Sequence, residues 1–325
     1  MNIVTALETF AVDGMEGGHD RVIETVLSKL FVRGDRVYKA YKHRSADFAD
    51  LADRDVRREY IAEDFFWNNA MAPEVYLELR GVCRDGDRIV HADHHSLGDD
   101  WYIVMQKIDT SSNLTEQLIR GVLSKNDLKQ YTDTLLPRLS ALTEARGEGL
   151  QEFFDNGESH VRSEVIGACG WASVAGQPEL SVEDVARAEK LLLRALEREP
   201  YFNAPINTLS VVIDTNGENI LFLNDGVSFI DVMPPKDAWR VHDRYFLICR
   251  TSADVSALDG NHADVLHEAY GEQHALPSDI VRTSYEIAAA LIQVPYRKMV
   301  GQDDLAAKYA DFVRERCDDL EALLG

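Results

Sequence analysis

The chain contains 325 residues, of which 45% are hydrophobic, and this is enough to bury a large core as one big domain or two closely joined lobes. Lysine and arginine number 34 against 56 aspartate and glutamate residues, so the formal net charge is −22. A charge of this sign repels phosphate backbones and anionic membrane surfaces, which argues against nucleic acid and membrane as partners. It is compatible with a cationic small-molecule substrate, although acidic proteins commonly carry such charge for solubility alone.

The four cysteines predict neither a disulfide framework nor a zinc ribbon, because they lie far apart and form no C-x-x-C pair. The segment from Met1 to Phe10 contains Glu8 and has no basic flank or apolar core, so it does not resemble a signal peptide. No window is apolar over the roughly 18 residues that a membrane span requires. We therefore expect a cytoplasmic protein.

The N-terminal third of the chain predicts a small sheet with one inserted helix. Alternation from Val22 to Lys42, interrupted at Arg33-Gly34-Asp35, is typical of a β-hairpin. Residues 54–70 follow with apolar side chains at helical spacings among many charges, which indicates a helix that lies against a sheet. Three segments separated by turns predict further strands: Val75 to Val82, Arg88 to Ala92 and the apolar run Trp101 to Met105.

Beyond Asp109 the chain is predicted to be mostly helical. Ser124 and Asp127 form a capping-box pattern at the start of one helix, which Pro137 should kink or divide. A second capping box begins the helix predicted over residues 181–200. Apolar spacings predict two more helices, from Ser278 to about Val294 and from Leu305 to Leu320.

A β-rich island interrupts these helices and contains the most informative pattern of the chain. Two short strands around Asn224-Asp225-Gly226 predict a hairpin. Before it lies Asp214-Thr-Asn-Gly-Glu-Asn219, a D-x-x-x-x-N pattern, and after it comes Phe229-Ile230-Asp231. Phosphoryl transfer requires a cation on the phosphates, a carboxylate at the acceptor hydroxyl and oxygen ligands for magnesium. The hairpin would bring two carboxylates and one amide to the same edge.

This island resembles the catalytic and metal-binding segment of aminoglycoside phosphotransferase-like kinases in the protein kinase-like superfamily. In that family the loop reads H-G-D-x-x-x-x-N, and a metal-binding aspartate follows the next hairpin. The resemblance implies that Asp214 is the catalytic base and that Asn219 and Asp231 bind Mg²⁺. It also implies that Lys39, in a predicted strand, binds the phosphates of ATP.

The helix predicted over residues 54–70 resembles the corresponding helix of an uncharacterised branch of that superfamily. The resemblance implies that an acidic residue of this helix pairs with the phosphate-binding lysine. We expect Glu63 to be the partner of Lys39, with Glu59, one helical turn earlier, as the second choice. The resemblance covers about residues 20 to 300 in a consistent order, and this order carries more weight than any single motif.

The implied fold is α+β and bilobal, like that of protein kinases. Residues 1–108 would form an N-terminal lobe with a small antiparallel sheet and one helix. Residues 109–325 would form a mostly helical lobe that contains the catalytic and metal-binding hairpin. The implied function is ATP-dependent and Mg²⁺-dependent phosphoryl transfer to a hydroxyl group of a small molecule. This requires the amine of Lys39 and the carboxylate of Asp231 to lie close together.

Departures from the family pattern keep other interpretations open. Val212-Ile213 stand where His-Gly normally precedes the catalytic aspartate, and the segment from Glu24 to Ser28 has no glycine where a glycine-rich phosphate loop is usual. One alternative is therefore a catalytically degenerate kinase-fold protein that binds nucleotide or has a regulatory role. Another is a metal-dependent phosphoesterase, because His91-Ala-Asp93-His94-His95 concentrates potential metal ligands, although a solvated loop explains this cluster better.

Overall fold

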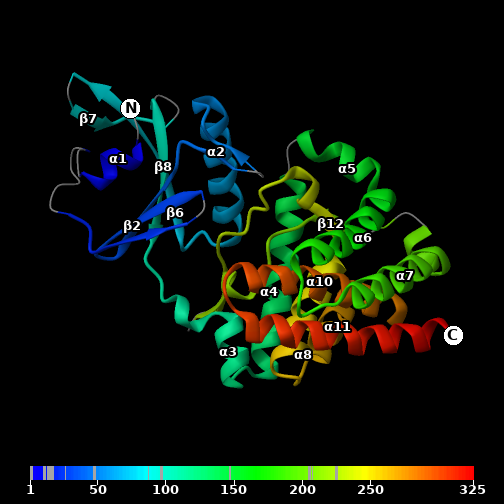
Figure 1. The fold of residues 1–325 in the computed structure, drawn as a ribbon. Helices are drawn as coiled ribbons and strands as arrows, with labels where there is room; N and C mark the ends of the chain where they lie inside the picture. The colour runs from blue at the N-terminus through cyan, green and yellow to red at the C-terminus, as the bar shows by residue number, and fades with distance from the viewer. Residues whose placement is uncertain are drawn as a thin grey trace. The chain divides into compact units, whose positions relative to one another are not determined.

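The chain, described from a computed structural model, forms two compact units (Figure 1). The first contains Met1–Thr110 and Ser228–Lys236, and the second contains Ser111–Val227 and Asp237–Gly325. Asp231, which the sequence-based boundary assigned to the helical lobe, thus belongs to the first unit. The structure describes residues 3–9, 12, 18–25, 27–46, 49–86, 88–95, 98–145, 148–203, 206, 208–223 and 226–325.

A six-stranded antiparallel sheet forms the centre of the first unit. Its strands lie in the order β1, β2, β3, β8, β6, β7: Arg21–Glu24, Ser28–Arg33, Arg36–Tyr41, Asp100–Gln106, Tyr76–Asp85 and Arg88–His91. The predicted hairpin is β2 and β3, in which Lys39 lies opposite Leu30. Gly34 in its turn has a φ of +57°, a left-handed conformation that glycine adopts without strain. β4 (Ser45–Ala46) and β5 (Ala49–Asp50) form a separate short pair.

Two helices cover opposite faces of this sheet. α1 (Ile3–Glu8) packs on the face where Tyr102 of β8 is buried (Figure 1). α2 (Arg54–Met71), which confirms the predicted helix, packs on the face where Ile103 is buried. Because successive side chains of a strand point to opposite faces, Lys39 on β3 lies on the face covered by α2.

The second unit is mostly helical. Its helices α3 to α11 are Leu114–Arg120, Lys125–Glu144, Gln151–Asp155, Gly157–Ala175, Val182–Arg198, Arg244–Leu258, Asp264–Gly271, Asp279–Met299 and Asp303–Leu324. α10 is the central helix, because it packs against α6, α8 and α11 and most of its residues are buried. The predicted capping boxes at Ser124 and Ser181 begin α4 and α7. Pro137 lies inside α4 and does not divide it.

Four short strands form two small sheets. β9 (Leu209–Val211) pairs with the antiparallel β12 (Val241–Asp243), and β10 (Ile220–Leu223) pairs with β11 (Gly226–Phe229). β10 and β11 are the strands of the predicted hairpin, whose turn residues 224–225 lie outside the described residues. The predicted α+β architecture, an antiparallel sheet with one long helix followed by a mostly helical remainder, is confirmed.

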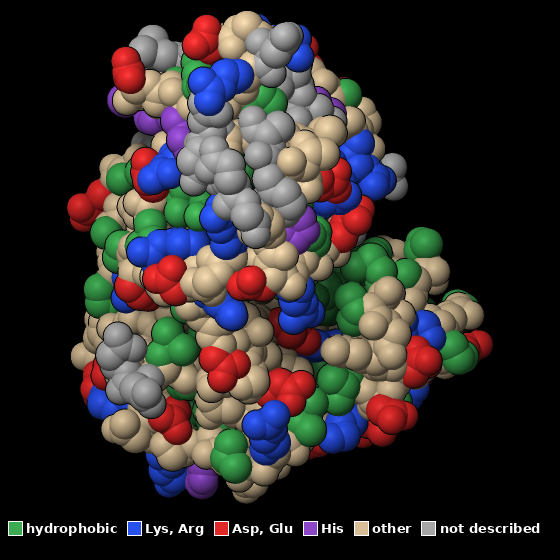
Figure 2. All heavy atoms as spheres, turned by 90° about the vertical axis from the view of Figure 1, so that its left-hand side faces the viewer, with side chains coloured by type: hydrophobic (Ala, Val, Ile, Leu, Met, Phe, Trp, Pro, Cys, Tyr) green, Lys and Arg blue, Asp and Glu red, His purple; other side chains and the backbone are tan. Residues whose placement is uncertain are grey.

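In the part of the chain that the structure describes, no helix is both long and apolar enough to cross a bilayer. Figure 2 presents one face, on which acidic and basic side chains are interspersed with apolar ones. The acidic residues behind the net charge of −22 therefore do not form a single block on this face. The distribution of charge on this face does not point to a binding site for a cationic substrate.

Candidate functional site

Lys39 of β3 is a buried cation between two carboxylates of the first unit. Its Nζ donates to Oδ2 of Asp64 in α2 at 3.0 Å and to Oδ1 of Asp231 at 2.8 Å. The Lys39 side chain is 6% exposed and that of Asp64 is 3% exposed, whereas that of Asp231 is 65% exposed. A buried ammonium group thus joins one buried and one solvent-accessible carboxylate, which places Lys39 beside Asp231 as the resemblance requires.

The opposite charges of Lys39 and Asp231 each favour the ionised form of the other. Burial disfavours the ammonium form, but the charges of Asp231 and Asp64 outweigh it and raise the pKa of Lys39 well above its ordinary value. The ammonium of Lys39 in turn lowers the pKa of Asp231. Burial raises the pKa of Asp64 despite the attraction of Lys39. Lys39 is therefore cationic and Asp231 anionic at neutral pH.

Backbone and amide contacts fix the position of Asp231. Its φ of +51° is uncommon for a residue other than glycine and persists only where the surroundings impose it. The Asp231 backbone N–H donates to the hydroxyl of Tyr76 at 2.9 Å, and that of Val232 donates to Oδ1 of Asn68 at 3.1 Å. Asn68 also donates from Nδ2 to Oδ1 of Asp64 at 2.9 Å. One amide side chain thus ties both carboxylates of the cluster into a single network.

Asp64 takes the place predicted for Glu63, so that prediction is wrong by one position. Glu63 and the second choice, Glu59, are both exposed on α2. The reason is helical periodicity: Arg57, Ile61 and Asp64 follow at intervals of four and three and form the buried stripe of α2. Counting forward from the apolar Ile61 would have identified Asp64 as the acidic residue that faces the sheet.

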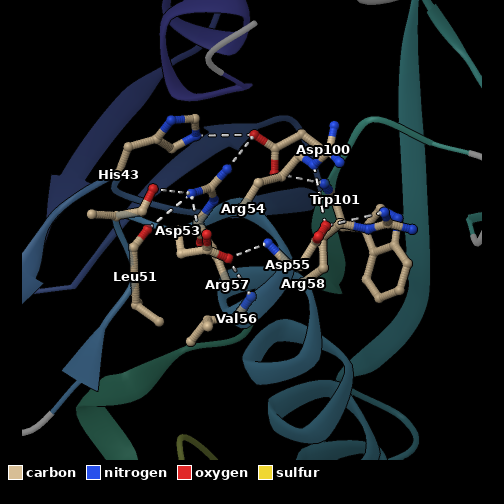
Figure 3. Close-up of polar contacts among 11 residues, drawn as sticks. His43, Leu51, Asp53, Arg54, Asp55, Val56, Arg57, Arg58, Asp100 and Trp101 are labelled. Atoms are coloured by element: carbon tan, nitrogen blue, oxygen red, sulfur yellow. Dashed lines mark hydrogen bonds and ion pairs between the residues drawn. The ribbon is translucent and has the colours of Figure 1, made fainter.

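A second buried network anchors the start of α2 (Figure 3). The guanidinium of Arg57 donates to the carbonyl of Leu51 at 2.8 Å and to Oδ2 of Asp100, the first residue of β8, at 3.4 Å. His43 Nε2 lies 3.0 Å from the same Asp100 oxygen. Burial opposes ionisation, but His43 and Arg57 together lower the pKa of Asp100. The network holds α2 to the sheet and so fixes the position of Asp64, two turns further along the helix.

The predicted catalytic loop lies in the second unit. Asp214 is 38% exposed, and its Oδ1 accepts from Nη2 of Arg250 at 2.8 Å and from the backbone N–H of Asn216 at 3.2 Å. Asn219 ends a short 3₁₀ turn, in which its N–H donates to the carbonyl of Asn216 at 2.8 Å. The loop therefore presents one carboxylate and one amide, at its first and last positions.

A buried arginine holds the middle of this loop. Arg297 of α10 has a fully buried side chain; its Nη1 forms an ion pair with Glu218, and its Nη2 donates to Oδ1 of Asn216 at 3.4 Å. Gly217 packs so closely on α3 that a Cβ there would lie 2.3 Å from Oγ1 of Thr115. The loop is thus fixed by a charge and by a steric contact.

Arg250 and Arg297 contact this loop, which has no histidine before Asp214. Val212 and Ile213, where the family has His-Gly, are buried apolar residues of the second unit. Sequence reasoning missed both Arg250 and Arg297. Each is an arginine in a helix segment that is otherwise largely buried, and this is the one signal in the sequence that points to them.

The histidine cluster of the first unit does not form a metal centre. Among the residues that the structure describes, no group of three or more histidine, cysteine, aspartate or glutamate side chains is placed to hold a metal ion. His91 Nε2 is instead 2.8 Å from the hydroxyl of Tyr102, and the rings of His94 and His95 lie 4.2 Å apart. With Asp93 they line an open cavity of about 360 Å³. The metal-dependent phosphoesterase interpretation gains no support.

Comparison with known proteins identifies the fold. No protein-family model matches the sequence, and no curated protein matches it. Choline kinase from Cryptosporidium parvum Iowa II is similar with a TM-score of 0.54 and 11% identity, over 99% of this chain and 96% of that chain. The GDP and kanamycin complex of APH(2")-IIia is similar with a TM-score of 0.51 and 12% identity, over 98% of both chains.

A third solved structure extends this group. A ternary complex of a thermostable mutant of aminoglycoside phosphotransferase APH(4)-Ia with AMP-PNP and hygromycin B has a TM-score of 0.50 and 15% identity, over 97% of both chains. At such low identity these similarities establish the fold alone. The expected kinase-like fold of the aminoglycoside phosphotransferase type is confirmed over nearly the whole chain.

Proposed function

We propose that this chain is a nucleotide-dependent phosphotransferase that transfers a phosphoryl group from ATP to a hydroxyl group of a small molecule. The observation that carries the proposal is the buried ammonium of Lys39, held between Asp64 and Asp231 in the sheet unit of a kinase-like fold. Kinases of this type need a fixed cation for the nucleotide phosphates and a carboxylate for the metal. Structures of similar fold contain GDP or AMP-PNP, which supports the use of a nucleotide.

Lys39 is suited to bind phosphate. Its positive charge is fixed by Asp64, which is buried and hydrogen-bonded in turn to Asn68. A cation that is already desolvated and held in place loses little freedom when a phosphate oxygen arrives. We therefore assign Lys39 to the nucleotide phosphates and Asp64 to the orientation of Lys39.

Asp231 and Asn219 are the proposed ligands of Mg²⁺. The donor set fits this hard cation, which prefers oxygen ligands, because Asp231 is exposed, ionised and fixed by its backbone, and Asn219 offers an amide oxygen. When bound, the metal supplies neutralisation of the charge on the phosphates. The side chains of Asp231 and Asn219 would hold the metal ion in position.

Asp214 is the proposed catalytic base. Among the described residues no hydrogen bond reaches its Oδ2, so this oxygen is available to the acceptor. The acceptor oxygen attacks the γ-phosphorus, the bond between the γ-phosphorus and the bridging oxygen breaks, and ADP leaves. The hydroxyl proton passes to Asp214.

The acceptor is proposed to be a small, cationic molecule. Two observations support this class: the net charge of −22, and the similarity in fold to a choline kinase and to complexes with kanamycin and hygromycin B. The second candidate function is a nucleotide-binding kinase-fold protein without catalysis. It is favoured by Val212 and Ile213 in place of His-Gly.

Titration with MgATP and a turnover assay distinguish these functions. Binding should raise the free energy of unfolding by about 2.7 kcal/mol at 100 times Kd. A catalyst also releases ADP, whereas a binding protein shows the stabilisation alone. The absence of any shift at millimolar MgATP would contradict both.

The matched variants are Asp231→Asn and Asp93→Asn, which make the same chemical change at two exposed aspartates of the first unit. Asp231→Asn should abolish Mg²⁺-supported turnover without unfolding the protein, and Asp93→Asn should leave turnover unchanged. Full turnover in Asp231→Asn refutes the assignment. If only Asp93→Asn loses turnover, the activity would depend on the histidine cluster that contains Asp93 and not on Asp231.

A further inference from the structure

The two carboxylate oxygens of Asp214 have unequal surroundings. Oδ1 accepts two hydrogen bonds, from Arg250 Nη2 at 2.8 Å and from the N–H of Asn216 at 3.2 Å. No hydrogen bond among the described residues reaches Oδ2. A carboxyl group otherwise rotates broadly about its terminal torsion. Two donors on one oxygen fix that rotation and leave the other oxygen facing outward from the pair.

Both donors are themselves held in place. Arg250 is 15% exposed and projects from α8, whose neighbouring residues are anchored: Thr251 Oγ1 donates to the Tyr131 hydroxyl at 2.7 Å, and Ser252 Oγ donates to Oε1 of Glu286 at 2.8 Å. The donors of a guanidinium group lie in a rigid planar fork, and the burial of most of the Arg250 side chain restricts its rotation.

The second donor belongs to the loop that Arg297 holds. Asn216 accepts from Arg297 through its side chain while its backbone N–H donates to Asp214. The loop that carries this N–H is therefore anchored by the buried cation of α10. The two arginines act on the same carboxylate, Arg250 directly and Arg297 through the loop.

We propose that Arg250 is a positioning residue for phosphoryl transfer: it holds Oδ1 of Asp214 so that Oδ2 is the oxygen that receives the proton of the acceptor hydroxyl. This inference rests on the proposed function. Stability alone does not account for the arrangement, because partly exposed ion pairs contribute little to stability. The Nε of Arg250 is moreover buried without a hydrogen-bond partner among the described residues, which is unfavourable in the folded state.

The test uses three variants of the full chain: Arg250→Lys, Arg250→Met and the control Arg314→Met. Arg314 forms another arginine–aspartate pair of the second unit, with Nη2 at 3.1 Å from Oδ2 of Asp184. The assay measures hydrolysis of MgATP with water as the acceptor, together with KM for MgATP and the melting temperature of each variant. Melting temperatures close to that of the wild type show that any loss is not due to unfolding.

Arg250→Met should lower kcat about 100-fold without changing KM for MgATP, because a misplacement of about 1 Å at a reacting group costs this much. Arg250→Lys should retain an intermediate kcat, because lysine keeps the charge but not the planar fork. Arg314→Met should match the wild type. A kcat of Arg250→Met within about twofold of the wild type, or a rise in KM alone, overturns the proposal.

Crystal structures of the wild type and of Arg250→Met provide an independent measurement. The carboxylate of Asp214 should move by about 1 Å or rotate in the variant. A carboxylate that stays within about 0.5 Å of its wild-type position overturns the proposal. If the wild type binds MgATP without hydrolysing it, the proposed phosphotransferase fails, and this comparison alone decides whether Arg250 holds Asp214.

Discussion

Replacing each of the two carboxylates at Lys39 should affect stability and nucleotide turnover to different degrees. Asp64→Asn and Asp231→Asn both remove one negative charge and keep the shape of the side chain. Asp64 is 3% exposed and lies 3.0 Å from Nζ, whereas Asp231 is 65% exposed and lies 2.8 Å from it. The distances are similar, so burial decides how much each pair contributes to folding.

The magnitude follows from the distance and the surroundings. At an effective dielectric constant of about 20, unit charges 3.0 Å apart attract by roughly 5.5 kcal/mol. Desolvation of two buried groups offsets several kcal/mol of this attraction. Asp64→Asn should therefore lower the free energy of unfolding by about 2–3 kcal/mol. Solvent screens the exposed Asp231, so Asp231→Asn should cost less than about 1 kcal/mol.

Urea unfolding at pH 7 measures the two free energies, and the MgATP assay measures the two activities. We expect Asp64→Asn to be the less stable variant. Asp231→Asn should lose Mg²⁺-supported turnover, whereas Asp64→Asn should lower turnover only in part, because Asp64 orients Lys39 and is not a proposed ligand of the metal. If the two variants lose equal stability, the argument from burial is refuted. If Asp64→Asn is as stable as the wild type, the buried ion pair between Lys39 and Asp64 does not stabilise the fold.

Two further predictions concern the second unit. Burial lowers the pKa of His242 to about 3, whereas the unfolded chain gains this proton near pH 6.5, so the free energy of unfolding should fall as the pH falls below 6.5. His242→Phe should remove about 2 kcal/mol of the difference between pH 7 and pH 5 in urea unfolding, and an unchanged difference would contradict this. Gly217→Ala should lower the free energy of unfolding by about 1–3 kcal/mol, because its Cβ would lie 2.3 Å from Oγ1 of Thr115. Thr115→Ala in the same chain should restore most of that loss, and a Gly217→Ala protein with wild-type stability would show that the loop adjusts freely.

The periodic parts of the fold were predictable from the sequence. Alternation around Gly34 predicts the β2–β3 hairpin, and helical spacing predicts α2, because these patterns reflect which side of an element faces the core. The proximity of Lys39 to Asp231, 192 residues apart, followed only from the order of motifs in a resembling family. Local patterns carry no information on such a distance.

The residues that sequence reasoning missed share one property. Asp64, Arg250 and Arg297 act through partners that are distant in sequence, such as the 36 residues between Arg250 and Asp214. Side-chain partners across a fold depend on how helices pack, and one turn of a helix offers several candidate carboxylates. Glu63 and Asp64 differ by one position in sequence but by about 100° around the helix axis, and burial selects between them.

The alternation of side chains along β3 has a consequence for insertions and deletions. Lys39 faces α2, while its neighbours Tyr38 and Ala40 belong to the apolar cluster under α1. If the turn at Gly34 lost one residue and the pairing slipped to compensate, every side chain of the strand would change faces. The ammonium group would then enter the apolar layer that contains Phe31 and would lose both of its carboxylate partners, Asp64 and Asp231. A single-codon deletion in this turn should therefore be far more damaging than most point substitutions in the strand itself.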